Sequence, residues 1–437
     1  MAGHSSSPLA SCPVLPYRLA TMTNHSALPW YRQLHWQIFI AMGLGIIAGL
    51  AGGEWIVPKV EWLGRLFILL LKMIIVPLVF TSIVSGVASL GGGRDLGRLF
   101  GKTLGYYVLS SLLAILVGLV VVNVIRPGVG ANILAAKSAQ LPSLAPPGSI
   151  TELLLSMVPE NILAAAAKPD MLSVIVFCIL FGMATAGLPR RPRKVLLHVF
   201  DAGFQAMMRL TQGVLKVAPL GVFGLITRAV GSSGIEVFKP MAVYMGTILI
   251  GLLFHLLITL PLLLRFLGGI NPRIHYRNMI EPLTMAFSTS SSGATLPVTM
   301  RAVEEKVGVS NRISSFVLPM GATVNMDGTA LYECAGVLFI AQVLGIHLDP
   351  AAQLVVVVTA LLASIGAAAV PSAGLVIIFL VLEAVNLRGP NVEAIVGLML
   401  AVDRPLDMLR TATNVFSDSC GAAIIARSEG ETKVDAE

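Results

Sequence analysis

The chain has 437 residues, of which 56% are hydrophobic and 12% charged, with a formal net charge of +7. Soluble domains carry about 25% charged residues, so this chain has too few charges to cover a water-facing surface. The composition excludes a soluble enzyme, a disordered protein and a nucleic-acid binder. An excess of basic residues is typical of the cytoplasmic loops of membrane proteins. We therefore expect an all-α polytopic protein whose surroundings are a lipid bilayer.

The four cysteines show no paired spacing, so neither a disulfide framework nor a zinc site is indicated. Residues 1–33 lack a charged start followed by an apolar core, and no cleavable signal peptide is expected there. We interpret this stretch as an N-terminal cytoplasmic segment, with Met22 as an alternative start.

Six stretches are long and apolar enough to span a membrane, which takes about 20 residues. They lie at roughly 35–52, 65–90, 103–125, 171–187, 196–230 and 238–266. The proline-rich stretch 126–170 is interpreted as an extramembrane connection. Basic clusters, such as Arg190 to Lys194, fall on alternate sides of the spans, which predicts cytoplasmic termini. Chance scatter of basic residues is the alternative.

Beyond residue 270 one pattern occurs twice: a broken apolar stretch followed by a longer one that holds charges. The broken stretches cover about 279–302 and 351–386, and the longer ones about 311–345 and 391–427. Irregular backbone at membrane depth is tolerated only inside protein or beside a watery cavity. Paired broken segments therefore predict a transporter binding site, although small residues also serve helix packing.

The last apolar segment carries a polar stripe. If it is helical, six of its side chains fall within an arc of about 100°, namely Asp403, Asp407, Arg410, Thr411, Asn414 and Asp418. Each charge at a helix centre costs about 2.5–3.5 kcal/mol when it meets lipid. The stripe must therefore face protein, water or a ligand.

Surplus carboxylates in this region predict a cation site. Asp407 and Arg410 can neutralise each other at i, i+3, but Asp403 and Asp418 have no evident partner in the sequence. The preceding segment adds Asp327 next to a glycine, where local unwinding would free backbone carbonyls. Carboxylates with free carbonyls suit a hard cation such as sodium, whereas internal ion pairing is the alternative.

Arg410 predicts an anionic ligand, because a guanidinium fork matches a carboxylate bidentately and cannot be deprotonated. Asp407, one turn away, can accept an ammonium group. Together they describe a zwitterion with one extra carboxylate, which is aspartate or glutamate.

Three motifs carry a resemblance to a known family. They are Ser290-Ser291-Ser292, Asn325-Met326-Asp327-Gly328-Thr329 and the stripe from Asp403 to Asp418. From about Trp36 to Arg427 the chain resembles the dicarboxylate/amino acid:cation symporters, which include excitatory glutamate transporters and archaeal aspartate transporters. The resemblance implies eight transmembrane helices and two re-entrant hairpins in an inverted-repeat elevator transporter. It also implies a homotrimer in a bacterial-type plasma (inner) membrane.

The resemblance also implies a division of the chain. Residues 34–270 would form mainly the scaffold and trimer contacts, with the third helix also serving the transport domain. Residues 271–427 would form that transport domain, followed by a cytoplasmic tail at 428–437.

By the same resemblance, each side of the substrate has its own set of residues. Ser292 and Asn414 would hold the α-carboxylate, Asp407 and Thr411 the amino group, and Arg410 with Thr329 the side-chain carboxylate. Ser290 belongs to this set at a position where some members carry arginine. Val370 and Gly374 would close the second hairpin over the substrate.

Three sodium sites are implied in the same way. The first combines Asp418 with carbonyls of Gly321, Asn325 and Asn414. The second uses carbonyls of Thr323, Ser364, Ile365 and Ala367. The third uses Asp327 and Asn325 with Tyr107, Ser110 and Ser111. Sodium would act as the coupling ion, and no cofactor is expected.

The expected function is import of L-aspartate or L-glutamate with sodium. Proton-coupled relatives resemble this chain but carry Asn at the place of Asp418, which favours sodium. The C4-dicarboxylate branch differs around Asp407 and Ile365. The alternatives are a proton-coupled C4-dicarboxylate symporter with an Asp327–Asp418 relay, a passive anion channel and an intramembrane aspartyl protease. The sequence has no Gly-x-Gly-Asp element for a protease, so we expect no enzyme.

Overall fold

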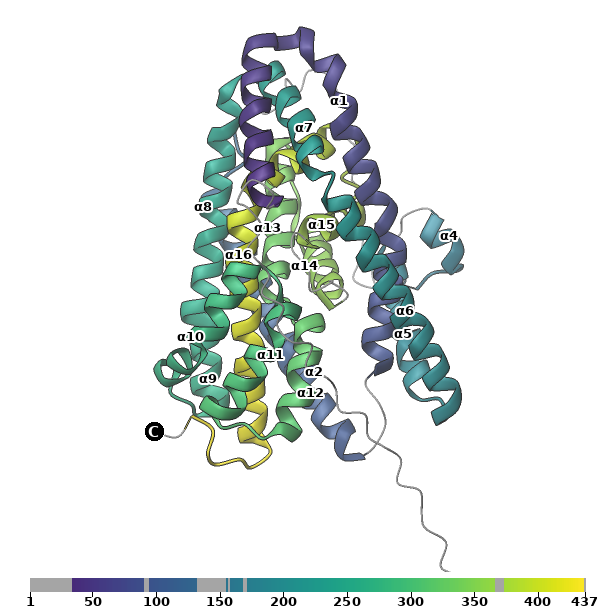
Figure 1. Ribbon diagram of the computed structural model, residues 1–437, viewed down its shortest axis with the longest axis vertical. Helices are drawn as coiled ribbons and strands as arrows, with labels where there is room; N and C mark the ends of the chain where they lie inside the picture. Colours follow the sequence, from purple (N-terminus) through teal and green to yellow (C-terminus); the bar gives the residue numbers. More distant parts are fainter. Residues whose placement is uncertain are drawn as a thin grey trace, which may run out of the picture.

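The computed structural model describes residues 34–89, 94–131, 155, 158–167, 171–365 and 373–435. These residues form helices and connections, with no strand among them. The helices run mostly along the long axis of the molecule (Figure 1). The N-terminal segment 1–33, Ala367 and Val370 lie outside the described residues.

The first half of the chain begins with α1, Leu34–Ser89, which contains two helices joined at Gly53. Gly53 has φ 45°, a left-handed conformation that favours glycine, and the chain reverses direction there (Figure 1). The second arm of α1 packs on the helices that follow it in this half of the chain, α5 (Met171–Ala186), α6 (Arg190–Leu215) and α7 (Ala218–Ser233). Among the described residues, this half also contains α2 (Arg94–Ile125) and α4 (Ile162–Ala167).

The second half is a series of helices that range from 3 to 39 residues in length. In chain order they are η2 (Ile235–Val237), α8 (Phe238–Phe254), the π-helix η3 (His255–Thr259), α9 (Leu260–Gly268), α10 (Pro272–Thr289), α11 (Ser292–Ala302), the π-helix η4 (Val303–Val307), α12 (Asn311–Val324), α13 (Asp327–Val343), α14 (Pro350–Ile365), α15 (Ala373–Ala384) and α16 (Pro390–Ser428).

Four helical stretches of the described chain are long and apolar enough to cross a membrane. They are Trp36–Gly53, Trp55–Ala88, Arg98–Ile125 and Ile235–Gly268. The predicted span at 196–230 is two helices, α6 and α7, bent by 48°, and counting this pair as one gives five. The predicted span at 171–187 is a shorter apolar helix, Ser173–Ala186.

The predicted break of the first hairpin is confirmed, and its serines build it. Ser290 ends α10 in a left-handed conformation with φ 51°, which costs a non-glycine residue about 1–2 kcal/mol. Ser291 then caps α11, its side chain accepting a hydrogen bond from the amide of Ala294 at 3.2 Å. The second predicted break lies between α14 and α15, outside the described residues.

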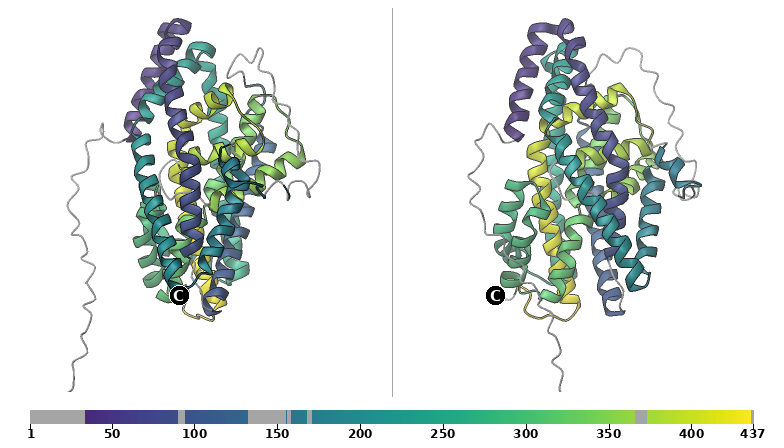
Figure 2. Two further views of the ribbon diagram at one scale, coloured as in Figure 1. Left: turned by 90° about the vertical axis from the view of Figure 1, so that its right-hand side faces the viewer. Right: turned by 45° about the vertical axis from the view of Figure 1, so that its right-hand side comes forward.

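The 39-residue helix α16 organises the second half of the molecule. It contacts α2 and every long helix from α7 to α13, and it lies among them in both turned views (Figure 2). Its polar stripe is therefore enclosed by protein, as the cost of bare charges in lipid requires.

The chain beyond α16 is fastened to other elements. Glu429 pairs with Lys102 at 2.5 Å and Arg98 at 2.7 Å on α2. The hydrogen bond from Lys102 and the nearby positive charges lower the pKa of Glu429. Asp435 contacts the buried His275 of α10 at 2.7 Å. The end of α16 is thus held against both α2 and the first hairpin.

Candidate functional site

The stripe of α16 is buried along its whole length and forms two polar centres. Its six predicted residues are each at most 5% exposed. One group surrounds Arg410, and we call Tyr332, Asp403, Asp407 and Arg410 the arginine centre. The other surrounds two carboxylates, and we call Ser110, Ser111, Asn325, Asp327, Ser417 and Asp418 the cation centre.

In the arginine centre one guanidinium serves two carboxylates. Arg410 Nη2 donates to Asp407 Oδ1 at 2.6 Å and lies 3.4 Å from Asp403 Oδ1. The expectation that Asp403 lacks a partner is therefore wrong, because the seven-residue separation places it two turns from Arg410 on the same face. Tyr332 stacks under the guanidinium with its ring centroid 4.1 Å from Cζ, a cation–π contact.

Arg410 keeps donors to spare. Its Nε and Nη1 have no hydrogen-bond partner among the described residues, although the side chain is only 1% exposed. A Cβ added at Gly374 would lie 2.5 Å from Nη1, so the start of α15 sits directly on the guanidinium. Leaving buried charged donors unmet is costly, which suits a site that receives an anion.

Asn414 and Thr329 meet where α13 crosses α16. Asn414 Oδ1 accepts from the amide of Gly328 at 2.7 Å, and its Nδ2 lies 3.4 Å from Thr329 Oγ1. A Cβ at Gly328 would be 2.9 Å from the carbonyl oxygen of Arg410, so glycine allows the two helices to touch. Thr411 donates to the carbonyl of Asp407 at 2.8 Å, within its own helix.

The first-hairpin serines are buried but stand apart from these partners. Ser290 is 1% and Ser292 5% exposed. Ser290 Oγ has no hydrogen-bond partner within the described part of the chain, and there neither serine bonds a residue of α16. The hairpin still reaches this helix, because Ala286 of α10 packs against Ala412 and Val415 of α16.

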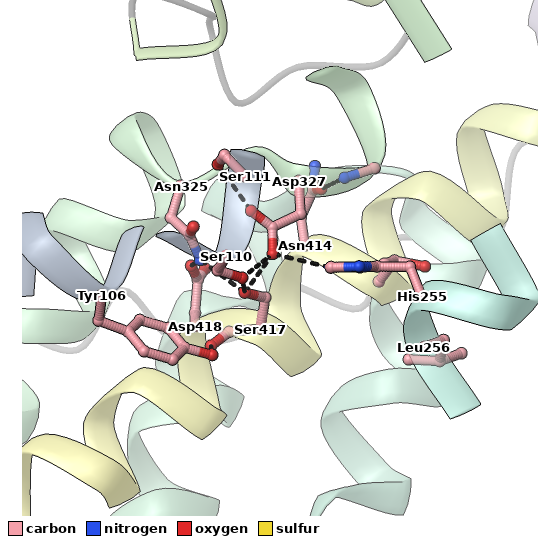
Figure 3. A network of polar contacts seen from close by, with 12 residues as sticks. Tyr106, Ser110, Ser111, His255, Leu256, Asn325, Asp327, Asn414, Ser417 and Asp418 are labelled. Atoms are coloured by element: carbon pink, nitrogen blue, oxygen red, sulfur yellow. Dashed lines mark hydrogen bonds and ion pairs between the residues drawn. The ribbon is translucent and has the colours of Figure 1, made fainter. Parts of the chain in front are cut away.

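Asp327 is the hub of the cation centre. It begins α13 and is fully buried. Its Oδ1 accepts from Ser111 Oγ at 2.7 Å, and its Oδ2 accepts from Ser417 Oγ at 2.6 Å and from Ser110 Oγ. His255 Nε2 lies 3.1 Å from Oδ2. Figure 3 shows these side chains converging on the carboxylate from separate helices.

Asn325 links Asp327's surroundings to Asp418. Its Nδ2 donates to Ser417 Oγ at 2.9 Å and to Asp418 Oδ1 at 3.0 Å. Asp418 thus accepts an amide hydrogen bond, and no Lys or Arg of the described residues pairs with it, as expected. Asn325 Oδ1 has no hydrogen-bond partner among the described residues, so an unused acceptor remains beside two carboxylates.

The backbone is unwound here, as predicted. Asn325 and Met326 leave helical geometry, with φ/ψ of −105°/81° and −112°/62°, whereas Gly328 lies inside α13. The last carbonyls of α12 lack intrahelical partners, and helix ends of this kind coordinate sodium in transporters. An oxygen-only donor set suits a hard cation.

The other predicted sodium ligands are placed in part. Gly321 faces Asp418 and Tyr107, because a Cβ there would lie 2.5 Å from Asp418 Oδ1 and 2.6 Å from Tyr107 Oη. Tyr107 itself donates to the carbonyl of Val317 at 2.8 Å. Thr323 and Ser364 use their hydroxyls within their own helices, bonding Met320 O and Leu361 O. Ile365 ends α14, and α12 contacts α14.

Sequence reasoning missed three buried polar residues. His255 lies in an otherwise apolar run and is turned toward Asp327 at the start of the π-helix η3, a distortion frequent at functional sites. Ser417 adjoins Asp418 and is fully buried. Glu333, also 0% exposed, has both carboxyl oxygens without a hydrogen-bond partner among the described residues. The feature of the sequence that could have identified them is a charged or polar residue within an apolar run.

Comparison with known proteins matches the sequence of this chain to one family. Residues 34–428 match the sodium:dicarboxylate symporter family. The chain is 34% identical to a proton/sodium-glutamate symport protein of Geobacillus stearothermophilus, covering 91% of this chain and 95% of that protein. It is 36% identical to an excitatory amino acid transporter of Caenorhabditis elegans, covering 83% and 80%.

A relative with another substrate is equally similar. The C4-dicarboxylate transport protein of Agrobacterium fabrum is 34% identical, over 94% of this chain and 92% of that protein. Overall sequence identity therefore does not distinguish a glutamate transporter from a C4-dicarboxylate transporter. The residues of the two centres have to make this distinction. On the extent of these matches, the chain belongs to the sodium:dicarboxylate symporter family.

Proposed function

We propose that this protein is a secondary active symporter that imports L-aspartate or L-glutamate together with sodium ions. The observation that carries the proposal is the arginine centre. Arg410 has two unused donors for a side-chain carboxylate, and Asp407 lies 2.6 Å from it to receive an ammonium group. A C4-dicarboxylate has no ammonium group for Asp407, which favours an amino acid.

The remaining substrate contacts follow the family pattern. Ser292 and Asn414 would hold the α-carboxylate, with Thr411 beside Asp407 at the amino group and Thr329 beside Arg410. Ser290, Val370 and Gly374 would complete the enclosure. The contact of α15 with Arg410 at Gly374 supports this arrangement, because a bound carboxylate would then lie between the guanidinium and the second hairpin.

Sodium is proposed to bind at three places. Asp418 with carbonyls of Gly321, Asn325 and Asn414 would form one site, and Asp327 with Asn325, Tyr107, Ser110 and Ser111 another. Carbonyls of Thr323, Ser364, Ile365 and Ala367 would form the third. The unwound backbone at Asn325 and Met326 and the unused Asn325 Oδ1 support the first two.

We propose an elevator mechanism that rests on a division of the chain into two parts. We propose that residues 34–270 form mainly the scaffold of a homotrimer, with the third helix also serving the transport domain of residues 271–427. Eight transmembrane helices, two re-entrant hairpins and cytoplasmic termini in a bacterial-type plasma (inner) membrane complete the proposal. Lys72 of α1 pairs with Glu393 of α16 at 2.6 Å, and this contact would lie between the two domains.

The second candidate is a proton-coupled C4-dicarboxylate symporter, and one observation favours its coupling ion. Glu333 is fully buried with no hydrogen-bond partner for either carboxyl oxygen among the described residues. A neutral carboxyl group costs far less to bury there than a carboxylate. A proton carried by Glu333 would serve coupling but would leave the position of Asp407 unexplained.

Uptake into proteoliposomes tests the proposal. Labelled L-aspartate is supplied with an inward sodium gradient in one arm and an inward proton gradient in the other. Uptake driven by sodium, and competed by glutamate but not succinate, is expected. Uptake driven by protons alone would overturn sodium coupling, and uptake of succinate in place of aspartate would overturn the substrate.

A further inference from the structure

Ser417 occupies the meeting point of three elements in the cation centre. Its hydroxyl lies 2.6 Å from Asp327 Oδ2 on α13, 2.9 Å from Ser110 Oγ on α2 and 2.9 Å from Asn325 Nδ2 at the unwound backbone. The side chain is fully buried. Figure 3 shows Ser417 beside Ser110 and Asp327, with Asp418 next to it.

Other hydroxyls of the same helix behave differently. Thr411, Thr413 and Ser419 each donate to a carbonyl of α16 itself, at 2.8, 2.9 and 2.7 Å. This back-bonding is the usual solution for a hydroxyl inside a helix. Ser417 instead directs its hydrogen across the interface to Asp327, so its hydroxyl serves the centre and not the helix.

Ser110 Oγ, Ser417 Oγ and Asp327 Oδ2 make three close contacts with one another, but the two hydroxyl groups supply only two hydrogens. Ser110 and Ser417 both donate to Asp327 Oδ2, and each hydroxyl has one hydrogen. No hydroxyl hydrogen is then left for the 2.9 Å contact between the two serine oxygens. Two serine oxygens therefore lie 2.9 Å apart beside a carboxylate with no hydrogen between them, an arrangement that a bound cation would relieve.

We propose that Ser417 Oγ is a cation ligand, and that it joins the sodium site at Asp327 to the site at Asp418. The inference rests on the proposed sodium coupling. When an ion binds, the hydroxyl hydrogens of Ser110 and Ser417 turn away from Asp327 and their oxygens face the ion. Asn325 Nδ2, which holds both Ser417 and Asp418, must then shift, and this shared amide couples the occupancy of the two sites.

Equilibrium binding of radiolabelled sodium to the purified full-length protein tests this role without transport. Ser417→Ala is expected to weaken the apparent sodium affinity on the order of tenfold. Ser417→Thr keeps the oxygen and restores most of the affinity. Thr413→Val is the matched control, because Thr413 is equally buried on α16 and bonds only its own helix; its sodium affinity stays unchanged.

A structural role predicts a different result. If Ser417 only satisfied Asp327, Ser417→Ala would lower the unfolding temperature in sodium-free choline buffer and leave the sodium affinity as in the wild type, and this outcome would overturn the proposal. If Ser417→Ala does not fold, Ser417→Cys makes the same test, since sulfur is a poor ligand for a hard cation. Absence of sodium binding by the wild type would overturn sodium coupling itself, whereas binding unaffected by both variants would overturn only the role of Ser417.

Discussion

The two polar centres of α16 handle buried charge in opposite ways. In the cation centre, hydroxyl, imidazole and amide groups surround Asp327 and Asp418, and no Lys or Arg of the described chain pairs with either. In the arginine centre, one guanidinium is shared between Asp403 and Asp407 and keeps two donors unused. On the proposed function, the first would be completed by a cation, whereas the second would be completed by a ligand that carries both signs.

This difference would give each centre its own ligand. A carboxylate buried among hydroxyl and amide groups is costly to keep charged, and a bound cation would offset this desolvation. Arg410 already neutralises part of the negative charge of Asp403 and Asp407. An amino acid can replace these internal contacts, with its ammonium group at a carboxylate and its own carboxylate at Arg410. Because α13 and α16 carry residues of both centres, cation binding can position the arginine centre for substrate.

The largest effect is expected from the removal of Arg410. Arg410→Ala is expected to weaken L-aspartate binding by two to three orders of magnitude, about the cost of truncating a buried charge pair, while sodium affinity in the absence of substrate changes little. Isothermal titration calorimetry with each ligand measures both. Arg404→Gln, which removes a second and more exposed cation 3.7 Å from Asp407, should weaken aspartate binding much less. Equal losses of sodium and aspartate affinity would contradict two separable centres.

Removal of Asp418 is expected to weaken sodium binding in the cation centre. Asp418→Asn takes away one of two carboxylates in the cation centre, and sodium affinity should fall about a hundredfold with a smaller Hill coefficient. Sodium-dependent uptake in proteoliposomes measures the cooperativity. Unchanged sodium cooperativity would show that this carboxylate binds no coupling ion.

Adding a methyl group at Gly321 tests where the ion binds in the cation centre. Gly321→Ala places a Cβ 2.5 Å from Asp418 Oδ1, and overpacking costs about 1–3 kcal/mol. We expect about tenfold weaker sodium binding by calorimetry. Gly105→Ala on α2 is the control, because a Cβ there meets no atom within 4 Å. Wild-type sodium affinity in Gly321→Ala would place the ion elsewhere.

The smallest effect is expected outside both centres, at the contact of α1 with α16. Lys72 and Glu393 are about one-third exposed, and such pairs contribute up to about 1 kcal/mol. Lys72→Met should change the maximal uptake rate by severalfold and leave aspartate affinity in detergent unchanged. The charge-exchanged pair Lys72→Glu with Glu393→Lys should return the rate toward the wild type. A loss of affinity in Lys72→Met would tie this pair to the binding site instead.

Much of this arrangement could be predicted from the sequence. Hydrophobic length predicted the long spans, the serines marked the first hairpin, and the spacing from Asp403 to Asp418 placed the stripe on one face. These features follow from helix periodicity and from the cost of charge in lipid.

The partners of the stripe could not be predicted in the same way. His255 and Ser417 contact Asp327 from helices distant in sequence, and a π-helix changes which face a residue occupies. Asp403 was expected to be unpaired because the adjoining spans offer few basic residues, whereas the long Arg410 side chain reaches it across two turns of the same helix. The position of unwinding, at Asn325 and Met326, precedes the glycine that signalled it.

Cation binding and substrate binding are proposed to be coupled through α13 and α16. This coupling is tested by the affinity of the purified protein for L-aspartate across a series of sodium concentrations, with choline keeping the ionic strength constant. We expect the apparent dissociation constant to fall steeply as sodium rises, and aspartate to tighten sodium binding by the same factor, as linkage requires. An aspartate affinity that is the same in choline and in sodium would contradict it.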